Sequence, residues 1–517
     1  MSFYEKNKKH LSFYSDLFEK LDKISDTAIE YEFVQAKNQA LTLKYKNVFL
    51  YSAYDPIREA KKNIDKIVLT DILILAGFGL GYTASMLQEK KEIKHLFILE
   101  FNLFYLKQLF TIKDFTDILK SQTIHLIYLQ EQVPSILNFY DLLENQTINI
   151  VIEKTFPPEY KPILIQLQDV IQNKKTELLT YSRLGKVWFD NFLKNYQLKN
   201  SMQSCELFQD KLAEKPVLLV GAGPSLKSKI DYIKNERKNI FIIAIDTILK
   251  YLLKNEIVPD LVLSVDSQVL SKLHFYGIES SSLTFLFDTL ANPDLVKKYI
   301  SKSYFFKSGN PLNQFFPSMP QTSEGLSAAN MAVDILYQLG VRTLYMIGVD
   351  FAYQKDTLYT GGNYFSLYWS SRINKFETLD VKYYAYYANR KLIPAQSKKG
   401  EPIQTTPILQ TYAKALNSYV SQKQNLRLIS LSDDILDNPH IEYKEQIDFN
   451  ASNNFENKLS QKIPQEQVEK DKMDNIIYPV LFYRLYRERK KKKFDMEKLK
   501  KKYKDIYLQK LLSLLKE

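Results

Sequence analysis

A short glycine-rich stretch near the middle of the chain could bind the phosphate of a nucleotide. The apolar run Val217–Val220 predicts a buried strand, and Gly221, Gly223, Pro224 and Ser225 follow it directly. Glycine permits positive φ and close backbone approach, proline fits the first turn of a helix, and first-turn N–H groups can face an anion. The order differs from the Gly-x-Gly-x-x-Gly and Gly-Lys-Ser/Thr loops, so a tight turn without a ligand remains the alternative.

Carboxylates follow three further apolar stretches of the same region. Asp246, Asp266 and Asp350 each come directly after such a stretch. Ligands of open α/β folds bind at the carboxyl ends of parallel strands. We therefore expect these side chains at one edge of a sheet, where a carboxylate can bind a ligand or act as a general base. A single carboxylate at such a position serves equally well as a helix cap.

A second stretch of small residues, 322–332, reads Thr-Ser-Glu-Gly-Leu-Ser-Ala-Ala-Asn-Met-Ala and leads into an amphipathic helix. Its hydroxyl and N–H groups could form a second anion cradle. The tyrosine-rich segment 353–387 suits either a mobile lid over a sugar or a packed aromatic insertion. The candidate ligand-binding residues in these two segments are Ser323, Gly325, Ser327, Asn330 and Tyr353, and Glu324 is a candidate base.

Apolar runs separated by helix-length segments predict an α/β protein with two Rossmann-like, doubly wound domains and a helical C-terminal region. The first group of runs comprises residues 72–75, 96–99, 124–128 and 148–152. The second group comprises residues 217–220, 241–245, 261–265, 283–287 and 344–349, and a further strand-like stretch follows at 426–431. The predicted segments are an N-terminal appendage (1–66), a Rossmann-like domain (67–155), a helical connector (156–211), the domain that carries the candidate site (212–420) and a helical, basic C-terminal region (421–517).

The first α/β unit has a glycine-rich turn of its own. Residues 77–82 read Gly-Phe-Gly-Leu-Gly-Tyr, and Glu100 follows the next predicted strand. This spacing suits a dinucleotide or S-adenosylmethionine site with Glu100 on a ribose hydroxyl. Because Phe78 and Tyr82 crowd the turn, a purely structural Rossmann-like domain is the alternative.

The positive charge of the chain is concentrated at its C-terminus. The 517 residues carry a net charge of +12, and residues 484–517 contain 14 basic and 5 acidic residues, which leaves the rest nearly neutral. A nucleic-acid-binding protein would spread basic residues along a groove, so we expect no nucleic-acid partner. The C-terminal stretch predicts a solvated helix or one that attracts an acidic partner.

Cysteine and histidine are scarce. The single cysteine, Cys205, excludes an internal disulfide and a multi-cysteine zinc site. The five histidines show no metal-ligand spacing, and the second unit has no Asp-x-Asp pair, so we expect no metal. No apolar run approaches the ~18 residues of a membrane span, and no signal-peptide core is found near Met1, which predicts a cytoplasmic protein.

Several of these motifs, in this order, resemble the motility-associated factor (Maf) flagellin glycosyltransferases. The matching stretches are residues 221–226, 264–266, 327–332 and 344–353. The central domain of that family is also described as 6-hydroxymethylpterin diphosphokinase MptE-like, and it is distantly similar to bacterial sialyltransferases. The resemblance covers about residues 195–420 well, and the 77–82 unit resembles the N-terminal domain of the family.

The resemblance implies a reaction. A nonulosonic acid, such as pseudaminic or legionaminic acid, would pass from its CMP-activated form to Ser or Thr of flagellin, with no cofactor beyond the donor. Asp246 and Asp266 would take the places of asparagines that contact CMP. The residues that would contact the donor phosphate are Gly221, Gly223, Pro224 and Ser225.

The chain departs from the sialyltransferase pattern at two places. Ala222 replaces the asparagine of the glycine loop, and no histidine occurs between Asp350 and Val420 to serve as the base. The candidate bases are therefore Asp350, Asp266 and Glu324. Two other functions remain open: a pterin pyrophosphokinase that needs ATP and magnesium, and a non-catalytic flagellin-binding assembly factor.

Overall fold

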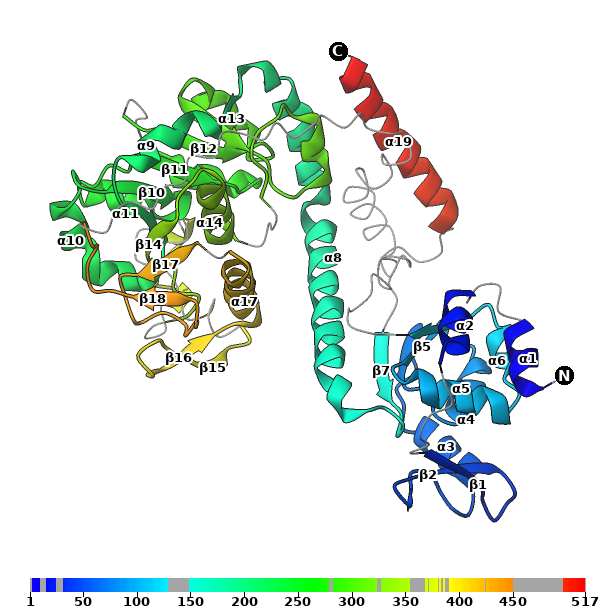
Figure 1. Cartoon of the computed structure of the whole chain (residues 1–517). Helices are drawn as coiled ribbons and strands as arrows, with labels where there is room; N and C mark the ends of the chain where they lie inside the picture. The colour runs from blue at the N-terminus through cyan, green and yellow to red at the C-terminus, as the bar shows by residue number, and fades with distance from the viewer. Residues whose placement is uncertain are drawn as a thin grey trace. The chain divides into compact units, whose positions relative to one another are not determined.

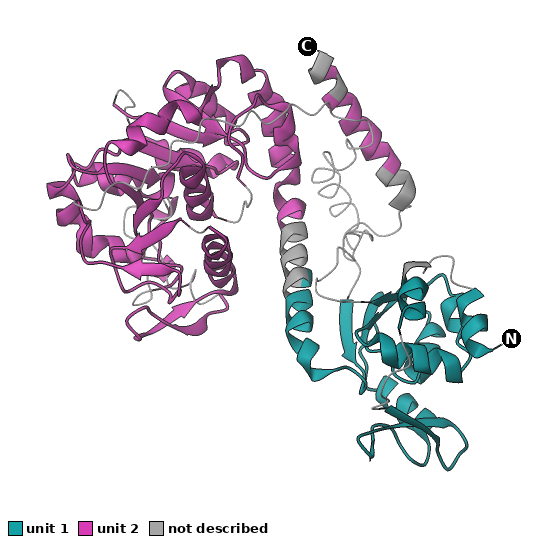
Figure 2. Cartoon of the chain, in the orientation of Figure 1, with its two compact units in different colours: residues 1–179 teal, residues 180–517 magenta. Residues whose placement is uncertain are grey.

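The computed structural model divides the chain into two compact units, Met1–Leu179 and Thr180–Glu517 (Figures 1 and 2). The boundary falls within the long helix α8 (Lys161–Tyr196), inside the predicted connector. Both units contain a parallel sheet with helices, which confirms the predicted α/β class. The structure describes residues 2–9, 15–24, 31–128, 148–278, 282–322, 327–353, 368–370, 372–379, 381–382, 385, 390–423, 425–449 and 496–516.

The first unit is built on a four-stranded sheet in the order β6-β5-β4-β7. All of its strand pairs are parallel, and each strand coincides with a predicted apolar run. The strands are β4 (Ile72–Ala76), β5 (His95–Glu100), β6 (Ile124–Tyr128) and β7 (Ile148–Ile152), and the helices between β4 and β6 are α4 (Tyr82–Gln88), α5 (Leu103–Ile112) and α6 (Thr116–Leu119).

The N-terminal segment packs into the core of the first unit. Leu17, Phe18 and Leu43 belong to the same buried cluster as Leu73 and Leu96 of the sheet. The predicted appendage therefore shares a hydrophobic core with the Rossmann-like domain. Its elements are α1 (Phe3–Lys9), α2 (Ser15–Asp22), α3 (Pro56–Ile64) and the antiparallel strands β1 (Tyr31–Gln35), β2 (Leu41–Tyr45) and β3 (Val48–Phe49).

The second unit is built on a nine-stranded sheet in the order β18-β17-β14-β9-β10-β11-β12-β13-β8, and every neighbouring pair is parallel. The sheet extends past residue 420, the predicted end of this domain, because β17 pairs with β14. The strands are β8 (Gln203–Ser204), β9 (Val217–Val220), β10 (Phe241–Ile245), β11 (Leu261–Ser264), β12 (Phe285–Asp288), β13 (Ser303–Phe306), β14 (Thr343–Ile347), β17 (Arg427–Ser430) and β18 (Ile441–Tyr443).

Helices cover both faces of this sheet, as a doubly wound fold requires. Leu219 of β9 packs in one buried cluster with α14 and α17, whereas Leu218 points to the opposite face and packs with α10 and α11. The end of α8 joins α13 on that opposite face. The helices are α9 (Gln209–Ala213), α10 (Ile230–Asn235), α11 (Leu249–Lys254), α12 (Lys272–Phe275), α13 (Pro293–Tyr299), α14 (Ala328–Gln338) and α17 (Pro407–Ser421).

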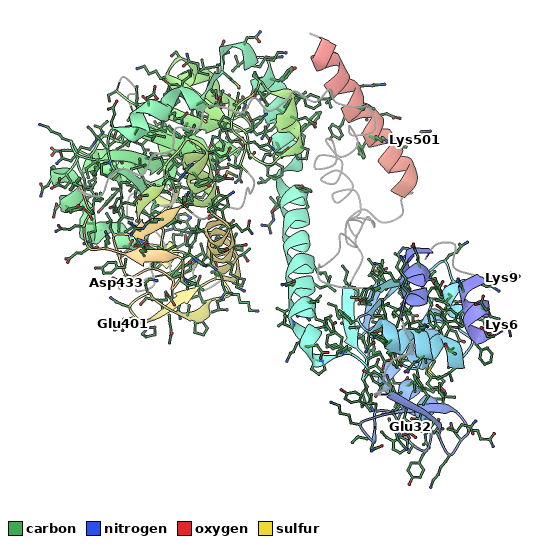
Figure 3. The ribbon with its side chains drawn as sticks, viewed as in Figure 1. Lys6, Lys9, Glu32, Glu401, Asp433 and Lys501 are labelled. Carbon is green, nitrogen blue, oxygen red and sulfur yellow. The ribbon has the colours of Figure 1, made fainter. Side chains whose placement is uncertain are left out.

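Two further elements complete the second unit. The strands β15 (Ile393–Gln396) and β16 (Pro402–Thr405) form an antiparallel hairpin. The C-terminal helix α19 (Met496–Lys516) buries Tyr507 in one cluster with Phe189 of α8. Within the described ranges, no helix is both long and apolar enough to cross a membrane. Charged side chains such as Glu32 in the first unit and Lys501 in the second lie on the outside (Figure 3).

Candidate functional site

The strand order of the second unit places a topological switch point between β9 and β14. From β9 the chain adds β10 to β13 on one side, and it then returns to add β14 on the other side. Ligands of open α/β sheets bind at the carboxyl ends of the strands near such a point. This edge carries the Gly221–Ser225 turn and the predicted carboxylates.

The Gly221–Ser225 turn lies directly against the turn that follows β14. The N–H of Gly221 donates to the carbonyl of Ile347 (2.8 Å), and the N–H of Gly223 donates to the carbonyl of Gly348 (2.7 Å). A Cβ on Gly221 would lie 2.3 Å from the Gly348 carbonyl oxygen. The φ of Gly223 is −66°, so this glycine is needed for close approach and not for positive φ.

Asp350 holds the same turn through Ser225. Its carboxylate is 3% exposed. It accepts hydrogen bonds from the backbone N–H (2.9 Å) and the hydroxyl (2.5 Å) of Ser225. The Ser225 hydroxyl in turn accepts from the N–H of Gly348 (3.1 Å). Burial raises the pKa of Asp350 to about 6. These contacts give Asp350 and Ser225 a positioning role, and the residue after Asp350, Phe351, adopts a positive φ of 51°.

Asp246 and Asp266 follow β10 and β11. Asp246 is buried and accepts a hydrogen bond from the hydroxyl of Ser264 (2.6 Å). Asp266 is half-buried, and its Oδ1 accepts from the backbone N–H of Gln268 (2.8 Å) and from the Gln268 side chain (3.3 Å). Its Oδ2 has no hydrogen-bond partner among the described residues. Burial, with a smaller contribution from the charge of Asp246, raises the pKa of Asp266. One carboxylate oxygen of Asp266 is therefore not used in hydrogen bonds by the described part of the chain.

A fourth carboxylate and a lysine at this edge were not predicted. Asp288 ends β12, is 5% exposed, and accepts from the N–H (3.0 Å) and hydroxyl (2.9 Å) of Ser308. Burial raises its pKa to about 6. The signal that could have revealed Asp288 was its place directly after the apolar run 283–287. Lys307 follows β13, a strand that was not predicted.

The described part of the small-residue loop makes local contacts. Ser327 is the N-cap of α14: its hydroxyl accepts from the N–H of Asn330 (3.1 Å) and donates to Asn330 Oδ1 (2.7 Å). The Asn330 side chain also donates to the carbonyl of Tyr412 (3.0 Å). The candidates Ser323, Glu324 and Gly325 lie outside the described residues.

Tyr353 joins the site region to the β15–β16 hairpin. Its ring is 2% exposed, and its N–H donates to the carbonyl of Gln404 (2.7 Å). The hydroxyl of Thr405 donates to the carbonyl of Phe351 (2.7 Å). The hairpin therefore packs beside the turn after β14. Most of the predicted lid, including residues 354–367, lies outside the described residues.

The glycine turn of the first unit uses its N–H groups internally. Gly77 donates to the carbonyl of Leu99 (2.7 Å), Phe78 to Glu100 (2.9 Å) and Gly79 to the hydroxyl of Thr155 (3.2 Å). The φ values of Gly77, Gly79 and Gly81 are 92°, 59° and 78°. The turn needs its glycines for its backbone conformation, and none of these three N–H groups remains for a phosphate.

The Glu100 side chain also forms its hydrogen bonds within the protein. The side chain is 1% exposed, and besides Phe78 it accepts from the N–H groups of Phe101 (2.8 Å) and Asn102 (2.9 Å). Burial raises its pKa despite these hydrogen bonds. The carboxylate thus joins the turn after β4 to the turn after β5, and it is not presented to a ribose hydroxyl.

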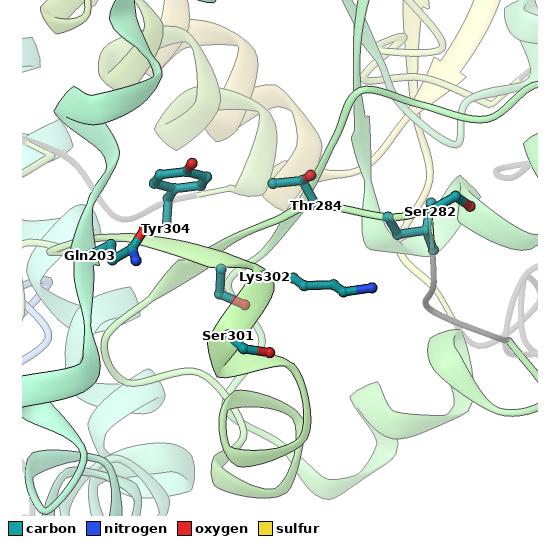
Figure 4. A pocket seen from close by; sticks show the side chains of 8 residues that line it. Gln203, Ser282, Thr284, Ser301, Lys302 and Tyr304 are labelled. Carbon is teal, nitrogen blue, oxygen red and sulfur yellow. The ribbon is translucent and has the colours of Figure 1, made fainter.

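A cavity of about 300 Å³ lies at the opposite end of the large sheet (Figure 4). It is formed where β8, β12 and β13 begin, away from the strand-end carboxylates. Its lining is polar, and Figure 4 shows the Lys302 side chain extending between the labelled serines. The lining residues are Gln203, Ser282, Leu283, Thr284, Ser301, Lys302, Ser303 and Tyr304.

Residues 190–356 match a protein-family model described as "6-hydroxymethylpterin diphosphokinase MptE-like". We call this stretch, residues 190–356, the MptE-like domain after the model that it matches. This domain contains strands β8 to β14 and the four strand-end carboxylates Asp246, Asp266, Asp288 and Asp350. The predicted resemblance at the level of this domain is confirmed.

The fold of most of the chain, including residues 190–356, is similar to that of a solved Maf glycosyltransferase from Magnetospirillum magneticum AMB-1. The TM-score is 0.61 at 14% sequence identity, and the match covers 87% of this chain and 75% of that chain. The predicted resemblance to the Maf proteins is thereby confirmed for the fold.

Two uncharacterized proteins of Treponema pallidum (strain Nichols) are similar in sequence. The first is 25% identical over 265 residues, which is 48% of this chain and 44% of the relative. The second is 26% identical over 125 residues, which is 23% of this chain and 57% of the relative. The chain thus spans about half the length of the curated relatives that it matches.

Proposed function

We propose that the chain is a glycosyltransferase that moves a nonulosonic acid from a CMP-sugar to Ser or Thr of flagellin. The observation that carries the proposal is the shared fold with the Maf glycosyltransferase over 87% of the chain. The strand-end carboxylates of the MptE-like domain support it, because glycosyl transfer to a hydroxyl needs a group that accepts a proton.

Asp266 is the proposed base. The acceptor hydroxyl oxygen forms a bond to the anomeric carbon of the sugar, and its proton passes to Asp266 Oδ2. The bond from the anomeric carbon to the phosphate oxygen breaks, and CMP leaves with its electron pair. The raised pKa of Asp266 brings its basicity closer to neutral pH, where a general base is most effective.

Asp350 and Asp246 are assigned supporting roles. Asp350 fixes the Gly221–Ser225 turn through both Ser225 contacts, so it keeps this part of the edge in one conformation. Asp246 contributes negative charge beside Asp266, which favours proton uptake there. Negative charge at this edge also stabilises the oxocarbenium-like sugar in the transition state. We propose that the reaction needs no metal and takes place in the cytoplasm.

The test uses the purified full chain with flagellin from the same organism. CMP-pseudaminic and CMP-legionaminic acid are supplied in separate reactions, and CMP release and the intact mass of flagellin are measured. We expect one donor to give a mass increase of one sugar residue together with stoichiometric CMP. Asp266→Asn should abolish both, whereas the matched control Asp231→Asn, at an exposed position of α10, should leave both unchanged. No mass increase with either donor would contradict the proposal.

A second candidate is favoured by the description of the family model for residues 190–356. A pterin diphosphokinase would transfer diphosphate from ATP to a hydroxymethylpterin and release AMP. The same preparation is therefore incubated with ATP, magnesium and 6-hydroxymethylpterin. AMP formation without CMP release in the donor assay would replace the first proposal with this one. A chain that binds flagellin but gives neither product would be a non-catalytic assembly factor.

A further inference from the structure

Two buried asparagines lie on one face of the long helix α8, near its C-terminal end. Asn191 and Asn195 are four residues apart, so their side chains project from the same side of the helix. They are 7% and 0% exposed. Asparagine is disfavoured in a helix interior, and a buried amide costs stability unless it is hydrogen-bonded. The groups that these two amides bind therefore explain their place in α8.

The Asn195 amide holds the turn that follows β12. Its NH₂ group donates to the carbonyls of Thr289 (2.9 Å) and Ala291 (2.9 Å), and all three residues are fully buried. An amide NH₂ group has two hydrogens, so both are used within this single turn. The turn after β12 does not carry the proposed base.

The Asn191 amide joins two turns instead. Its NH₂ group donates to the carbonyl of Leu290 (3.1 Å), in the turn after β12, and to the carbonyl of Ser267 (2.8 Å), in the turn after β11. Ser267 directly follows Asp266, the proposed base. Asn191 therefore holds the backbone one residue away from the base.

The rest of the segment that carries the base, residues 266–268, is held in a similar way. The N–H of Asn292 donates to the carbonyl of Asp266 (3.2 Å), and the Asn292 side chain donates to the carbonyl of Gln268 (3.2 Å). Together with the bond from Asn191, each of the three carbonyl groups of the segment accepts from a residue outside it. Because Asp266 Oδ1 accepts from the N–H of Gln268 (2.8 Å), the place of Oδ2 follows that of this backbone.

We propose that Asn191 is a positioning residue for Asp266, and that its hydrogen bond to the Ser267 carbonyl keeps Oδ2 where it takes the proton of the acceptor hydroxyl. The inference rests on the proposed function, since it needs Asp266 as the base. A displacement of about 1 Å from the reactive geometry can lower a rate roughly 100-fold. Asn195 is similarly buried but does not bind the segment 266–268, so we assign it a structural role only.

The experiment compares wild type with Asn191→Ala and with the matched control Asn195→Ala. Each variant removes one buried amide from the same helix, and each takes a donor from two backbone carbonyls. The full chain is assayed with CMP-sugar and flagellin, and kcat per folded molecule and the KM for the donor are measured. We expect Asn191→Ala to lower kcat about 10- to 100-fold with the KM within about 2-fold of wild type, and Asn195→Ala to keep kcat within about 2-fold.

Thermal unfolding keeps positioning apart from a loss of folded protein. Because each variant leaves two buried carbonyl groups without a donor, both should unfold at a temperature lower by roughly 2–6 °C. A purely structural role of Asn191 would give both variants the same kcat per folded molecule. Equal kcat values of Asn191→Ala and Asn195→Ala would therefore overturn the inference.

Hydrogen exchange tests the inference without the transfer assay. In Asn191→Ala, the peptide that covers residues 265–271 should exchange about 10-fold faster than in wild type, whereas Asn195→Ala should change its exchange less than about 2-fold. Unchanged exchange of this peptide in Asn191→Ala would overturn the inference, whatever the rates of transfer. Failure of the proposed function is recognised differently: wild type itself would then transfer no sugar from either donor.

Discussion

The two glycine-rich turns of this protein are similar in sequence but differ in what surrounds them. One turn follows β4 and the other follows β9, each a strand inside a parallel sheet, and both turns use their N–H groups to bond to the protein. In the first unit, side chains fill the surrounding space: a Cβ on Gly79 would meet Tyr51 and Glu153, and one on Gly81 would meet Phe115. In the second unit the nearest neighbours of the turn are the backbone of Gly348 and the side chains of Val349 and Asp350.

The difference lies in which polar groups remain without a protein partner. In the first unit Glu100 receives three backbone hydrogen bonds and is almost fully buried. Along the corresponding edge of the second unit, the Oδ2 atom of Asp266 and the hydroxyl of Thr322 have no hydrogen-bond partner within the described ranges. A glycine turn after a strand is therefore not evidence of a ligand site. The unpaired groups on the neighbouring strands are the better evidence.

The largest effect is expected from Gly221→Ala in the second unit. The new Cβ would lie 2.3 Å from a backbone carbonyl oxygen of Gly348, and neither turn can move without breaking their mutual hydrogen bonds. We expect a loss of at least about 3 kcal/mol in the free energy of unfolding, measured by urea denaturation. Gly400→Ala is the control: its φ is +88°, with no atom within 4 Å of the new Cβ, so it should cost only about 1 kcal/mol. Equal losses would show that close approach is not what Gly221 provides.

The next effect concerns activity. We expect Asp266→Asn to lower kcat for sugar transfer about 10²- to 10⁴-fold, since the proposed base is lost. The amide oxygen can still accept from Gln268, so the unfolding temperature should stay within about a degree of wild type. Initial rates of CMP release and thermal unfolding measure the two properties. A variant that retains full activity would remove Asp266 from the mechanism and direct attention to Asp350.

Glu100→Gln tests whether the glycine turn of the first unit is purely structural. Because the carboxylate accepts from three backbone N–H groups, the amide NH₂ of glutamine must face at least one of those donors. We expect a loss of about 1–3 kcal/mol in the stability of the first unit and no change in the transfer rate per folded molecule. Urea unfolding and CMP release separate these results. An activity loss with unchanged stability would show that Glu100 acts on a substrate.

The sequence predicted most of the fold because apolar periodicity is local. All four strands of the first sheet coincide with predicted runs. In the second sheet β8, β13 and β18 were missed. β8 and β18 have only two and three residues, and the four residues of β13 begin with Ser303 after the polar pair Ser301 and Lys302, so none of them stands out as an apolar run. Because β13 was not predicted, Lys307 at its end was not considered. Asp288 was not considered because the predicted run 283–287 ends one residue before the end of β12.

The contacts of the candidate site could not be predicted in the same way. The motif residues Gly221, Gly223 and Ser225 gave no sign that their N–H groups are used internally, because the partner turn lies about 125 residues away. Glycine and serine at these positions are equally typical of a phosphate-binding loop and of a turn packed against another turn. Only the tertiary pairing of β9 with β14 separates these alternatives.

The smallest expected effect is a difference in pH response between the two units. His95 and His125 lie side by side in the first unit (3.3 Å between ring nitrogens), and burial lowers both pKa values, that of His125 to about 4. A lowered histidine pKa means that the unfolded state binds protons first, so stability is lost as pH falls from about 6.5 towards 4. In the second unit burial raises the pKa of Asp288 and Asp350 to about 6.

A raised carboxylate pKa has the opposite consequence, because the folded state binds the proton first and stability is gained as pH falls from about 6 towards 4. Between pH 7 and 5 we expect the two histidines to cost the first unit on the order of 1 kcal/mol after allowance for their partial exposure, against an opposite contribution from Glu100, whose pKa burial raises, and we expect the second unit to gain about 1 kcal/mol. Hydrogen exchange, read separately for peptides of β5–β6 and of β12–β14, measures both changes. His125→Phe should remove the acid sensitivity of the first unit, since a phenyl ring can keep the contact with Phe97. The same acid response of the first unit in wild type and in His125→Phe would contradict the role assigned to the buried histidine.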